Sequence, residues 1–516
     1  MINTSAAYQS AIIADSRKIL LRVVVDLISP DITYSAGSSS GETDISNIAQ
    51  LHNKVLQIEP SYATLEHNRW ALDGSFGILP VSAGDEIGFE SSAVSVSDCT
   101  VNAYAEIAFS NVNILQACSV YFTDNETDGY AVDFSVDVYS GGNVEYTETF
   151  TGNTATSVNL TGFTVNNPDA IRVTVTKWSL PNRRVRIAEI LAGVYEIWDA
   201  DDLAGFEITN ATDFASASLP YGTCKIQVDN STGRFSPRNK SGLFQSLEER
   251  QGIITAIGVQ GGGYVPTGTF YQYSGGWNTS RSGLTMAWNL VDIIGLLASR
   301  RFTVPVSLPT TLQGWVAEIV SQLGTNFAGH YTLSGVTGTT SLTTNADAVT
   351  DVTCGQILQW ICQRACCYMR ADATTGYLVL STLGNAGNTY TLDNLSAYPE
   401  ESANADVANI TFEFPDETKL VITSTSSASP NTLTIKNPFI VNATQAAATA
   451  AWIFQFYGGN AISTTGRGDP STEIGDVVTV EFDNNETAAG RVASQSFKIS
   501  SGVLQQCKTK LIGGAV

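Results

Sequence analysis

The chain has 516 residues, with 49 Asp or Glu against 27 Lys or Arg, so its formal net charge is −22. This balance argues against a nucleic-acid-binding surface, which needs clustered basic side chains. Only 15% of the residues are charged and 44 are glycines, a composition typical of a β-dominated protein with many tight turns. The length predicts about three to four domains.

Neither a leader sequence nor a membrane span is predicted. No apolar stretch approaches the roughly 18 residues that a spanning helix needs, and the first residues lack a basic segment followed by an apolar run. We therefore expect a soluble protein made in a cytoplasm. The eight cysteines form no CxxC pair, and we expect them to be reduced, small apolar residues. Cys366 and Cys367 are adjacent, but a vicinal disulfide would be strained.

The N-terminal region predicts one strand and one irregular segment. Alternation over residues 18–28 predicts a strand whose inward face consists of Leu21, Val23, Val25 and Leu27. Residues 64–76, TLEHNRWALDGSF, follow a Gly/Ser-rich loop, and Asp73-Gly74 supplies a tight turn. We expect this segment to be seated on a core by its apolar side chains, Leu65, Trp70, Leu72 and Phe76.

Residues 81–200 carry short alternating strands without helical periodicity, which predicts a β-sandwich. The clearest strands are 117–122, with Cys118, Val120 and Phe122 on one face, 131–139 and 171–178. An acidic loop follows the first of them and consists of Asp124, Asn125, Glu126 and Asp128. These oxygen ligands could hold Ca²⁺, but without the regular spacing of a calcium loop we expect a plain turn. Tyr130 or Tyr139 could stack on a sugar ring, although strand cores are rich in aromatics anyway.

Residues 219–237, LPYGTCKIQVDNSTGRFSP, are the most informative stretch. Cys224, Ile226 and Val228 alternate with polar residues, as in a half-buried strand. Residues 229–233 then tolerate positive φ or bond their own backbone, which predicts a turn. Further strands at 253–259, 266–271 and 284–290 predict a barrel-like meander. The Gly261-Gly262-Gly263 run lies between strands, so it predicts a hairpin and not a phosphate cradle.

Helices are predicted only in the second half of the chain. The first has its apolar face at residues 312–323 and a capping box of Thr310 with Gln313, and the second begins with Thr353 and Gln356. A hairpin over 368–380 turns at Thr375-Gly376. The third helix spans 443–457, with Asn442 as N-cap and Gly458 at C′. A strand with Val478, Val480 and Phe482 facing inward follows, and then a hairpin around Ser501-Gly502.

Residue constellations for catalysis are scarce. His52, His67 and His330 are the only histidines, which leaves little material for a triad or a zinc site, and no GxSxG, HExxH, P-loop or dinucleotide-binding motif occurs. We expect His67 to pack or hydrogen-bond. Arg467-Gly468-Asp469 spells an integrin-binding tripeptide, but we expect a turn that leads into a strand. No catalytic, cofactor-binding or metal-binding residue is therefore predicted, and we expect no enzyme activity.

Two stretches resemble phage tail hub, or tail-tip (baseplate hub), proteins. One is residues 64–76, through its Thr-Leu-Glu, Asn-x-Trp and Leu-Asp-Gly-Ser-Phe pieces, and the other is the Asp-Asn-Ser-x-Gly-Arg-Phe pattern of residues 229–235. Weaker matches follow in the order seen in that family: PTGTFY at 266–271, GQILQ at 355–359 and GDPSTEIGD at 468–476. Separately, residues 171–193 resemble the last strands of discoidin-like jelly rolls.

The resemblance implies a mainly β fold with β-barrel tube-like domains, a β-sandwich jelly roll and a small α+β module. Residues 1–80 would begin a first hub barrel, 81–200 would be an inserted discoidin-like jelly roll, and 201–300 would complete the barrel. Residues 301–385 would form the α+β module, and 386–516 a second hub barrel with one helix. The strand at 224–228 would then pair with the N-terminal strand around residues 22–27.

The family implies a homotrimeric structural virion protein at the tail tip, assembled in the host cytoplasm. It would close the distal end of the tail tube and guide passage of the tape-measure protein and of DNA, which a negative lumen repels instead of binding. Implied partners are the distal tail protein, the tail tube and fibre or spike proteins. Because the chain ends after the last hairpin, no C-terminal hydrolase domain is expected.

Two alternative functions stay open at this point. One is a carbohydrate-binding host-receptor protein that recognises a cell-surface glycan through the jelly roll. The other is a cell-wall glycoside hydrolase, because the spacing of acidic residues in sequence does not give the separation of a catalytic carboxylate pair in space.

Overall fold

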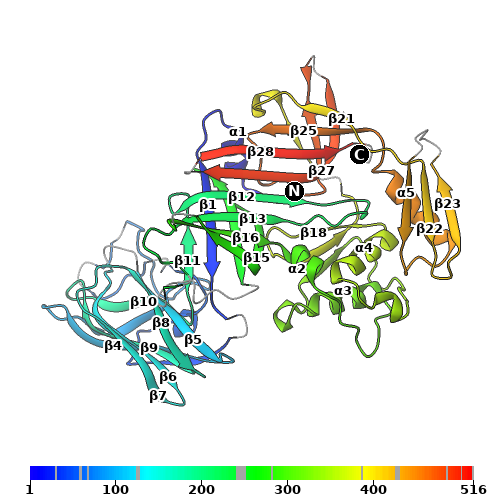
Figure 1. Ribbon diagram of the computed structural model, residues 1–516. Helices are drawn as coiled ribbons and strands as arrows, with labels where there is room; N and C mark the ends of the chain where they lie inside the picture. The colour runs from blue at the N-terminus through cyan, green and yellow to red at the C-terminus, as the bar shows by residue number, and fades with distance from the viewer. Residues whose placement is uncertain are drawn as a thin grey trace. The chain divides into compact units, whose positions relative to one another are not determined.

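A computed structural model describes residues 1–29, 32–56, 58, 61–66, 69–71, 73–123, 128–236, 238–239, 251–280, 283–384, 387–424, 431–483, 486–500 and 503–513. The chain forms two compact units. The first consists of Met1–Val24, Ile197–Ser231 and Glu249–Val516, and the second of Val25–Glu196 and Thr232–Glu248. Strands dominate both (Figure 1), so the mainly β class with a small helical module is confirmed.

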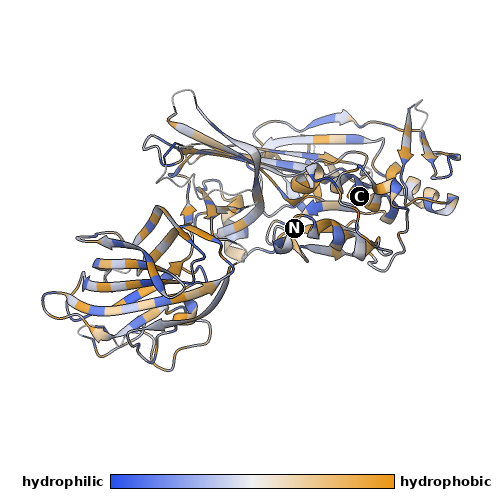
Figure 2. Cartoon of the chain, turned by 60° about the horizontal axis from the view of Figure 1, so that its bottom comes forward, coloured by the Kyte–Doolittle hydropathy of each residue, from blue (hydrophilic) through white to orange (hydrophobic). Residues whose placement is uncertain are grey.

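The second unit contains a sandwich of two antiparallel sheets. One sheet has the order β2-β4-β9-β6-β7 and the other β3-β10-β5-β8. The strands are β2 (Thr33–Ser39), β3 (Phe89–Val94), β4 (Thr100–Ser110), β5 (Ile114–Phe122), β6 (Ala131–Ser140), β7 (Asn143–Phe150), β8 (Ser157–Asn166), β9 (Ala170–Trp178) and β10 (Arg184–Leu191), with a 3-10 turn, η1, at Ile48–Gln50. Apolar and polar residues alternate along these strands (Figure 2), which gives each sheet one inward face.

The sandwich core forms where the two inward faces meet. Phe122 from β5 contacts Phe134 from β6 and Trp178 from β9 edge-on, with ring centroids 5.2 and 6.0 Å apart. All three rings are buried. The predicted strands at 117–122, 131–139 and 171–178 are therefore confirmed, as is the shared buried face of Cys118, Val120 and Phe122.

A thirteen-stranded sheet organises the first unit. Its order is β11-β1-β14-β15-β16-β13-β12-β27-β28-β25-β21, and β26 pairs with both β27 and β20. The strands are β1 (Ile19–Asp26), β11 (Tyr195–Trp198), β12 (Leu203–Ala211), β13 (Thr223–Asp229), β14 (Gly252–Val259), β15 (Gly263–Thr279), β16 (Thr285–Val291), β20 (Gly387–Tyr390), β21 (Glu400–Ala403), β25 (Asn460–Gly466), β26 (Val477–Glu481), β27 (Thr487–Ser500) and β28 (Val503–Ile512).

The strand at 224–228 exists as predicted, but its expected pairing is wrong. It forms β13, and Cys224, Ile226 and Val228 are buried. β13 pairs with β12 and β16, and the β14-β15-β16 meander separates it from the N-terminal strand β1. Strands close in sequence pair at a lower loop-closure cost, so the local partners displaced the distant one.

A helical module in the first unit packs against a small sheet of order β17-β19-β18. Its elements are α2 (Ile293–Ser299), α3 (Leu312–Ser321), η3 (Thr325–Phe327), β17 (Tyr331–Ser334), η4 (Asp347–Val349), α4 (Cys354–Ala365), β18 (Tyr368–Ala371) and β19 (Leu378–Ser381). The α4 cap is confirmed, because the Thr353 hydroxyl accepts from the Gln356 N–H at 3.1 Å. The α3 cap is Thr311, not the predicted Thr310, since Thr311 accepts from the Gly314 N–H.

Three further strands and two helices complete the first unit: β22 (Asn409–Glu413), β23 (Lys419–Thr423), β24 (Thr432–Lys436), α1 (Ala6–Ile13) and α5 (Ala443–Phe454), with η5 at Leu392–Asn394. The predicted N-cap of α5 is confirmed, because Asn442 accepts from the Gln445 N–H at 3.0 Å. The helix ends at Phe454, before the predicted Tyr457. None of the helices in the described ranges has the length and apolar character needed to cross a membrane. The hairpin turn expected at Ser501-Gly502 lies outside the described residues.

Candidate functional site

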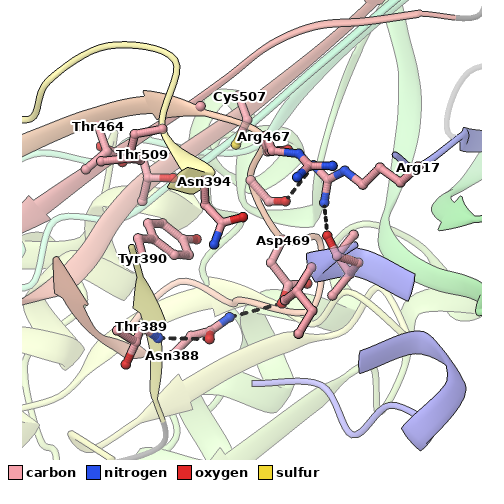
Figure 3. Close-up of a pocket in the computed structure, with 15 residues that line it drawn as sticks. Arg17, Asn388, Thr389, Tyr390, Asn394, Thr464, Arg467, Asp469, Cys507 and Thr509 are labelled. Carbon is pink, nitrogen blue, oxygen red and sulfur yellow. Dashed lines mark hydrogen bonds between the residues drawn. The ribbon is translucent and has the colours of Figure 1, made fainter. Parts of the chain in front are cut away.

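The Arg467-Gly468-Asp469 tripeptide lies directly after β25, where it is hydrogen-bonded to the N-terminal segment (Figure 3). Arg467 donates through Nη2 to the carbonyl of Ala14 at 2.6 Å. Arg17 donates in return to the carbonyls of Arg467 and Gly468. Its other nitrogen, Nη1, caps the end of α1 by donating to the Ile12 carbonyl at 2.6 Å.

Asp469 is equally engaged within the chain. Its Oδ1 accepts from the Tyr8 hydroxyl at 3.1 Å and from the Ser471 N–H at 2.9 Å, and its Oδ2 accepts from Asn388 Nδ2 at 3.0 Å. Burial and the neighbouring Asp469 charge raise the pKa of Tyr8, and burial with the nearby Arg467 charge lowers the pKa of Arg17. Both charged side chains of the tripeptide therefore bond within the chain. These hydrogen bonds join the chain's first 17 residues to residues 467–469, and we call this contact the clasp.

Gly468 cannot be replaced without strain in this clasp. Its φ of +63° lies in the left-handed region that favours glycine. A Cβ there would lie 2.2 Å from the Cys507 sulfur. The buried Cys507 thiol has a pKa raised to about 12 because of its burial, so it is a packing group and not a nucleophile.

The space enclosed by the clasp is small. The cavity between α1, β20 and the tripeptide has a volume of about 50 Å³, enough for one or two water molecules. Small-molecule sites usually measure about 300–1,000 Å³. We therefore assign the clasp a structural role, fastening α1 onto the thirteen-stranded sheet.

Residues 64–76 bury charged side chains and expose apolar ones, so the expected seating on Leu65 and Trp70 is wrong. Glu66 and Arg69 are 5% and 3% exposed, whereas Trp70 is 60% exposed and Leu65 is fully exposed. Phe76 is only half-buried. The physical reason is that Glu66 and Arg69 form ion pairs with residues far away in sequence, and these pairs hold the charged side chains of the segment inside. Leu72 and His67 lie outside the described residues.

The ion pairs form a buried network with Glu66 at its centre. Arg186 of β10 pairs with Glu66 and, at 2.5 Å, with Glu90, while Arg69 pairs with Asp128. Burial opposes ionisation of Glu66, but the hydrogen bond and charge of Arg186 outweigh it and lower the pKa of this carboxyl. Burial beside Arg186 lowers the pKa of Arg69 to about 10. The network fixes the segment in one position.

The apolar side chains displaced outward line an open cavity of about 730 Å³, which we call the Trp70 surface. It is lined by Ile45, Leu65, Trp70, Phe76, Ile78 and Leu79, among others. Ile78 and Leu79 are 79% and 52% exposed. Contiguous exposed apolar groups of this kind typically mark contact surfaces with other proteins.

The remaining sequence candidates are occupied by packing or by ion pairs. His52 stacks on Tyr34 and His330 on Tyr377, with ring centroids 4.0 and 4.4 Å apart. Burial lowers the pKa of both imidazoles. Asp124, Asn125 and Glu126 lie outside the described residues, and Asp128 is the partner of Arg69. Within the described ranges, His, Cys, Asp and Glu form no group of three that could hold a metal ion.

The tyrosines, cysteines and glycines singled out from the sequence also have structural surroundings. Tyr139 packs beside the Arg172 guanidinium at 5.2 Å, and Tyr130 packs against the sandwich core. All eight cysteines are free, as predicted, and Cys366 ends α4 with a φ of +52°. The Gly261-Gly262-Gly263 run forms the predicted hairpin between β14 and β15.

No protein-family model matches the chain, and neither does any curated protein. Among solved structures, it is similar to a 43 kDa prophage tail protein from Shewanella oneidensis, with 17% identity and a TM-score of 0.41 over 62% of this chain and 96% of that one. A tail protein from Neisseria meningitidis gives 14% identity and a TM-score of 0.41, covering 62% and 94%. A prophage tail protein from Listeria monocytogenes gives 10% identity and a TM-score of 0.40, over 62% of this chain and 92% of that one.

Further structural neighbours include chains of phage baseplates. Others are a component of the E. coli type VI secretion system and a chain of a gene transfer agent particle. At these identities and TM-scores the likeness by itself assigns no function to this chain.

Proposed function

We propose that the protein is a structural component of a phage tail, the homotrimeric hub that closes the distal end of the tail tube. The observation that carries this proposal is the resemblance of residues 64–76 and 229–235 to tail hub proteins. In this role the hub guides the tape-measure protein and DNA outward during genome ejection. It also joins the distal tail protein and the tail tube to the fibre or spike proteins that attach to the host.

The fold supports the proposal by bringing the resembling pieces together. The 229–235 pattern directly ends β13, PTGTFY lies in β15, and GDPSTEIGD leads into β26. These pieces are far apart in sequence, yet all of them border one thirteen-stranded sheet. A single scaffold therefore carries three of the five resembling pieces.

The Trp70 surface supports a role within an assembly. The segment that resembles hub proteins holds Trp70 and Leu65 outward on a frame of buried ion pairs. A contact with another protein would bury these exposed apolar side chains.

The domain division proposed from the sequence belongs to the same proposal. The sequence suggests an inserted discoidin-like jelly roll over residues 81–200 and an α+β module over 301–385 between two hub barrels, 1–80 with 201–300 and 386–516. The second unit already begins at Val25 and its β2 belongs to the sandwich, so within this proposal the insertion starts before residue 81. An acidic chain suits a passage that DNA must traverse without being held, because like charges repel the phosphates.

Size and shape test the proposal directly. Light scattering and electron-microscope images of the purified full chain should give a trimer with three lobes around a channel wide enough for a DNA duplex. A compact monomer that also fails to join purified tail-tube rings would refute the hub. Binding of the full chain to a glycan array through residues 81–200 would favour the receptor alternative. Release of sugar from cell walls by the purified protein would favour the hydrolase alternative.

A further inference from the structure

A second cavity of the first unit has the size of a ligand site. It lies where α4, η4, the turn between β22 and β23 and the residues after β24 come together, and its volume is about 780 Å³. This value falls within the range of about 300–1,000 Å³ typical of small-molecule sites. We call it the α4 cleft. Its aromatic residues are Trp360 and Phe414, and its charged residues are Asp347, Glu413, Glu417, Lys419 and Lys436.

The two aromatic residues of the α4 cleft stand on a fixed backbone. Asn437 is 3% exposed and donates through Nδ2 to the Trp360 carbonyl at 2.8 Å and to Gln363 Oε1 at 3.0 Å. The Phe414 N–H donates to the Thr418 carbonyl at 3.0 Å and so closes the β22–β23 turn. Both rings remain partly exposed in the cleft. A preorganised, partly exposed aromatic ring offers an apolar face for stacking.

The charged wall of the cleft presents both signs. Glu413 of β22 lies between two lysines on the neighbouring strands, with Lys419 Nζ at 2.8 Å and Lys436 Nζ at 2.7 Å. The lysine side chains are 63% and 75% exposed, so each ammonium group keeps N–H donors pointing to solvent. Asp347 and Glu417 are exposed and add carboxylate acceptors.

Aromatic faces beside donors and acceptors of both signs select one class of ligand. Three carboxylates and two ammonium groups leave the lining near neutrality, and the chain's net charge of −22 disfavours a polyanion. A hydroxyl group both donates and accepts, so it can pair with either sign. We propose that the α4 cleft binds a neutral carbohydrate, with a pyranose ring stacked on Trp360 and hydroxyls bonded to the carboxylates and lysines.

This site is independent of the hub role and of the sandwich. It belongs wholly to the first unit, whereas the receptor alternative places glycan binding within residues 81–200. A trimeric hub that binds no sugar would therefore refute the α4 cleft proposal alone, and a monomer that binds sugar would refute the hub proposal alone.

Saturation-transfer NMR of the full chain with neutral hexasaccharides of glucose, N-acetylglucosamine, galactose and rhamnose tests the cleft. We expect at least one to bind and Trp360→Ala to weaken that binding about tenfold, the loss expected for one stacking contact. Tyr264→Ala is the matched control, because this tyrosine is 45% exposed on β15 and lines none of the cleft. It should leave binding unchanged.

A second pair of variants keeps the test decisive if Trp360→Ala disturbs the helical core. Asp347→Asn with Glu417→Gln changes only exposed side chains and should weaken binding at least threefold while leaving the unfolding midpoint unchanged. The proposal is overturned if none of the four neutral hexasaccharides binds at 10 mM (about the weakest useful affinity). It is also overturned if the carboxylate variant binds normally, or if only a sulfated polysaccharide binds.

Discussion

Single residues decide how firmly the first residues of the chain are held. Tyr8 is 2% exposed and its hydroxyl reaches Asp469. Tyr8→Phe removes one hydrogen bond to a carboxylate and should lower the free energy of unfolding by about 1–2 kcal/mol. Urea unfolding measures this loss, and Tyr264→Phe, at an exposed position, should change stability by less than about 0.5 kcal/mol. Equal losses in both variants would contradict the clasp.

Substitutions at two glycines distinguish the stability cost of backbone strain from that of a steric clash. Gly468 and Gly261 both have positive φ, +63° and +80°, but a Cβ on Gly261 meets nothing within 4 Å. Gly261→Ala should therefore cost about 1 kcal/mol of backbone strain. Gly468→Ala adds the clash with Cys507 and should cost about 3 kcal/mol or more. If Cys507→Ala does not restore part of that loss, the clash is not its cause.

Glu189 should give the second unit a pH-dependent stability. It is fully buried, and its Oε1 accepts from the Val55 N–H at 2.7 Å. Burial raises its pKa to about 8 against two opposing backbone hydrogen bonds. Because the folded-state pKa lies above the unfolded value, the neutral acid favours folding below about pH 4.5, and this advantage is lost as pH rises toward 8.

Glu189→Gln keeps the acceptor and removes the charge. The variant should gain stability over the wild type by roughly 5 kcal/mol at pH 9, where the pKa difference of about 3.5 is fully expressed, and very little at pH 4. Urea unfolding of both proteins between these pH values measures the difference. A difference that does not grow with pH would contradict the assignment.

The buried network decides whether the segment around Trp70 stays in place. Arg186→Ala leaves Glu66 and Glu90 without their shared partner, and breaking a buried pair typically costs about 3–5 kcal/mol. We expect proteases to cleave near residues 64–79 in this variant before the rest of the chain. Arg301→Ala is the control, because its pair with Asp351 is exposed and should contribute less than about 1 kcal/mol.

Elements with a local signature could be predicted from the sequence. The period-2 strands of the sandwich, β13, and the caps Thr353 and Asn442 all follow from neighbouring residues. The short helix α1 was missed because its apolar residues form no continuous stripe, and only Tyr8 and Ile12 are buried. Thr310 was predicted as the cap of α3 because Gln313 completes a capping box with it, but the next residue, Thr311, is also a good N-cap and forms the bond instead.

Features that depend on distant partners could not be predicted. Glu66 and Arg69 are buried because Arg186 and Asp128 come from elements far away in sequence, and no local pattern reveals that. The same applies to the clasp around Asp469 and to the α4 cleft. Each depends on topology and not on the spacing of neighbouring residues.

For the whole molecule, the charge of −22 predicts that it does not bind DNA and that its association with other copies depends on salt. The full chain should not retard duplex DNA in a gel at low salt, because like charges repel. In the proposed trimer, copies of the chain would repel each other for the same reason, so the trimer fraction in sedimentation should rise between about 0.02 and 0.5 M salt. Retarded DNA, or a trimer that salt dissociates, would contradict this electrostatic account.

The sheet order of the first unit also constrains when that unit can form. β12 pairs with β27, residues 206–211 against 494–499, and the clasp joins the first 17 residues to residues 467–469. During synthesis the paired elements of the sandwich are complete some 300 residues earlier, as chains fold from the N-terminus onward. Until β27 is made, the edge of β12 is unpaired, and an open edge invites other chains. A nascent chain stalled before residue 487 should therefore hold a folded sandwich and an aggregation-prone half-sheet.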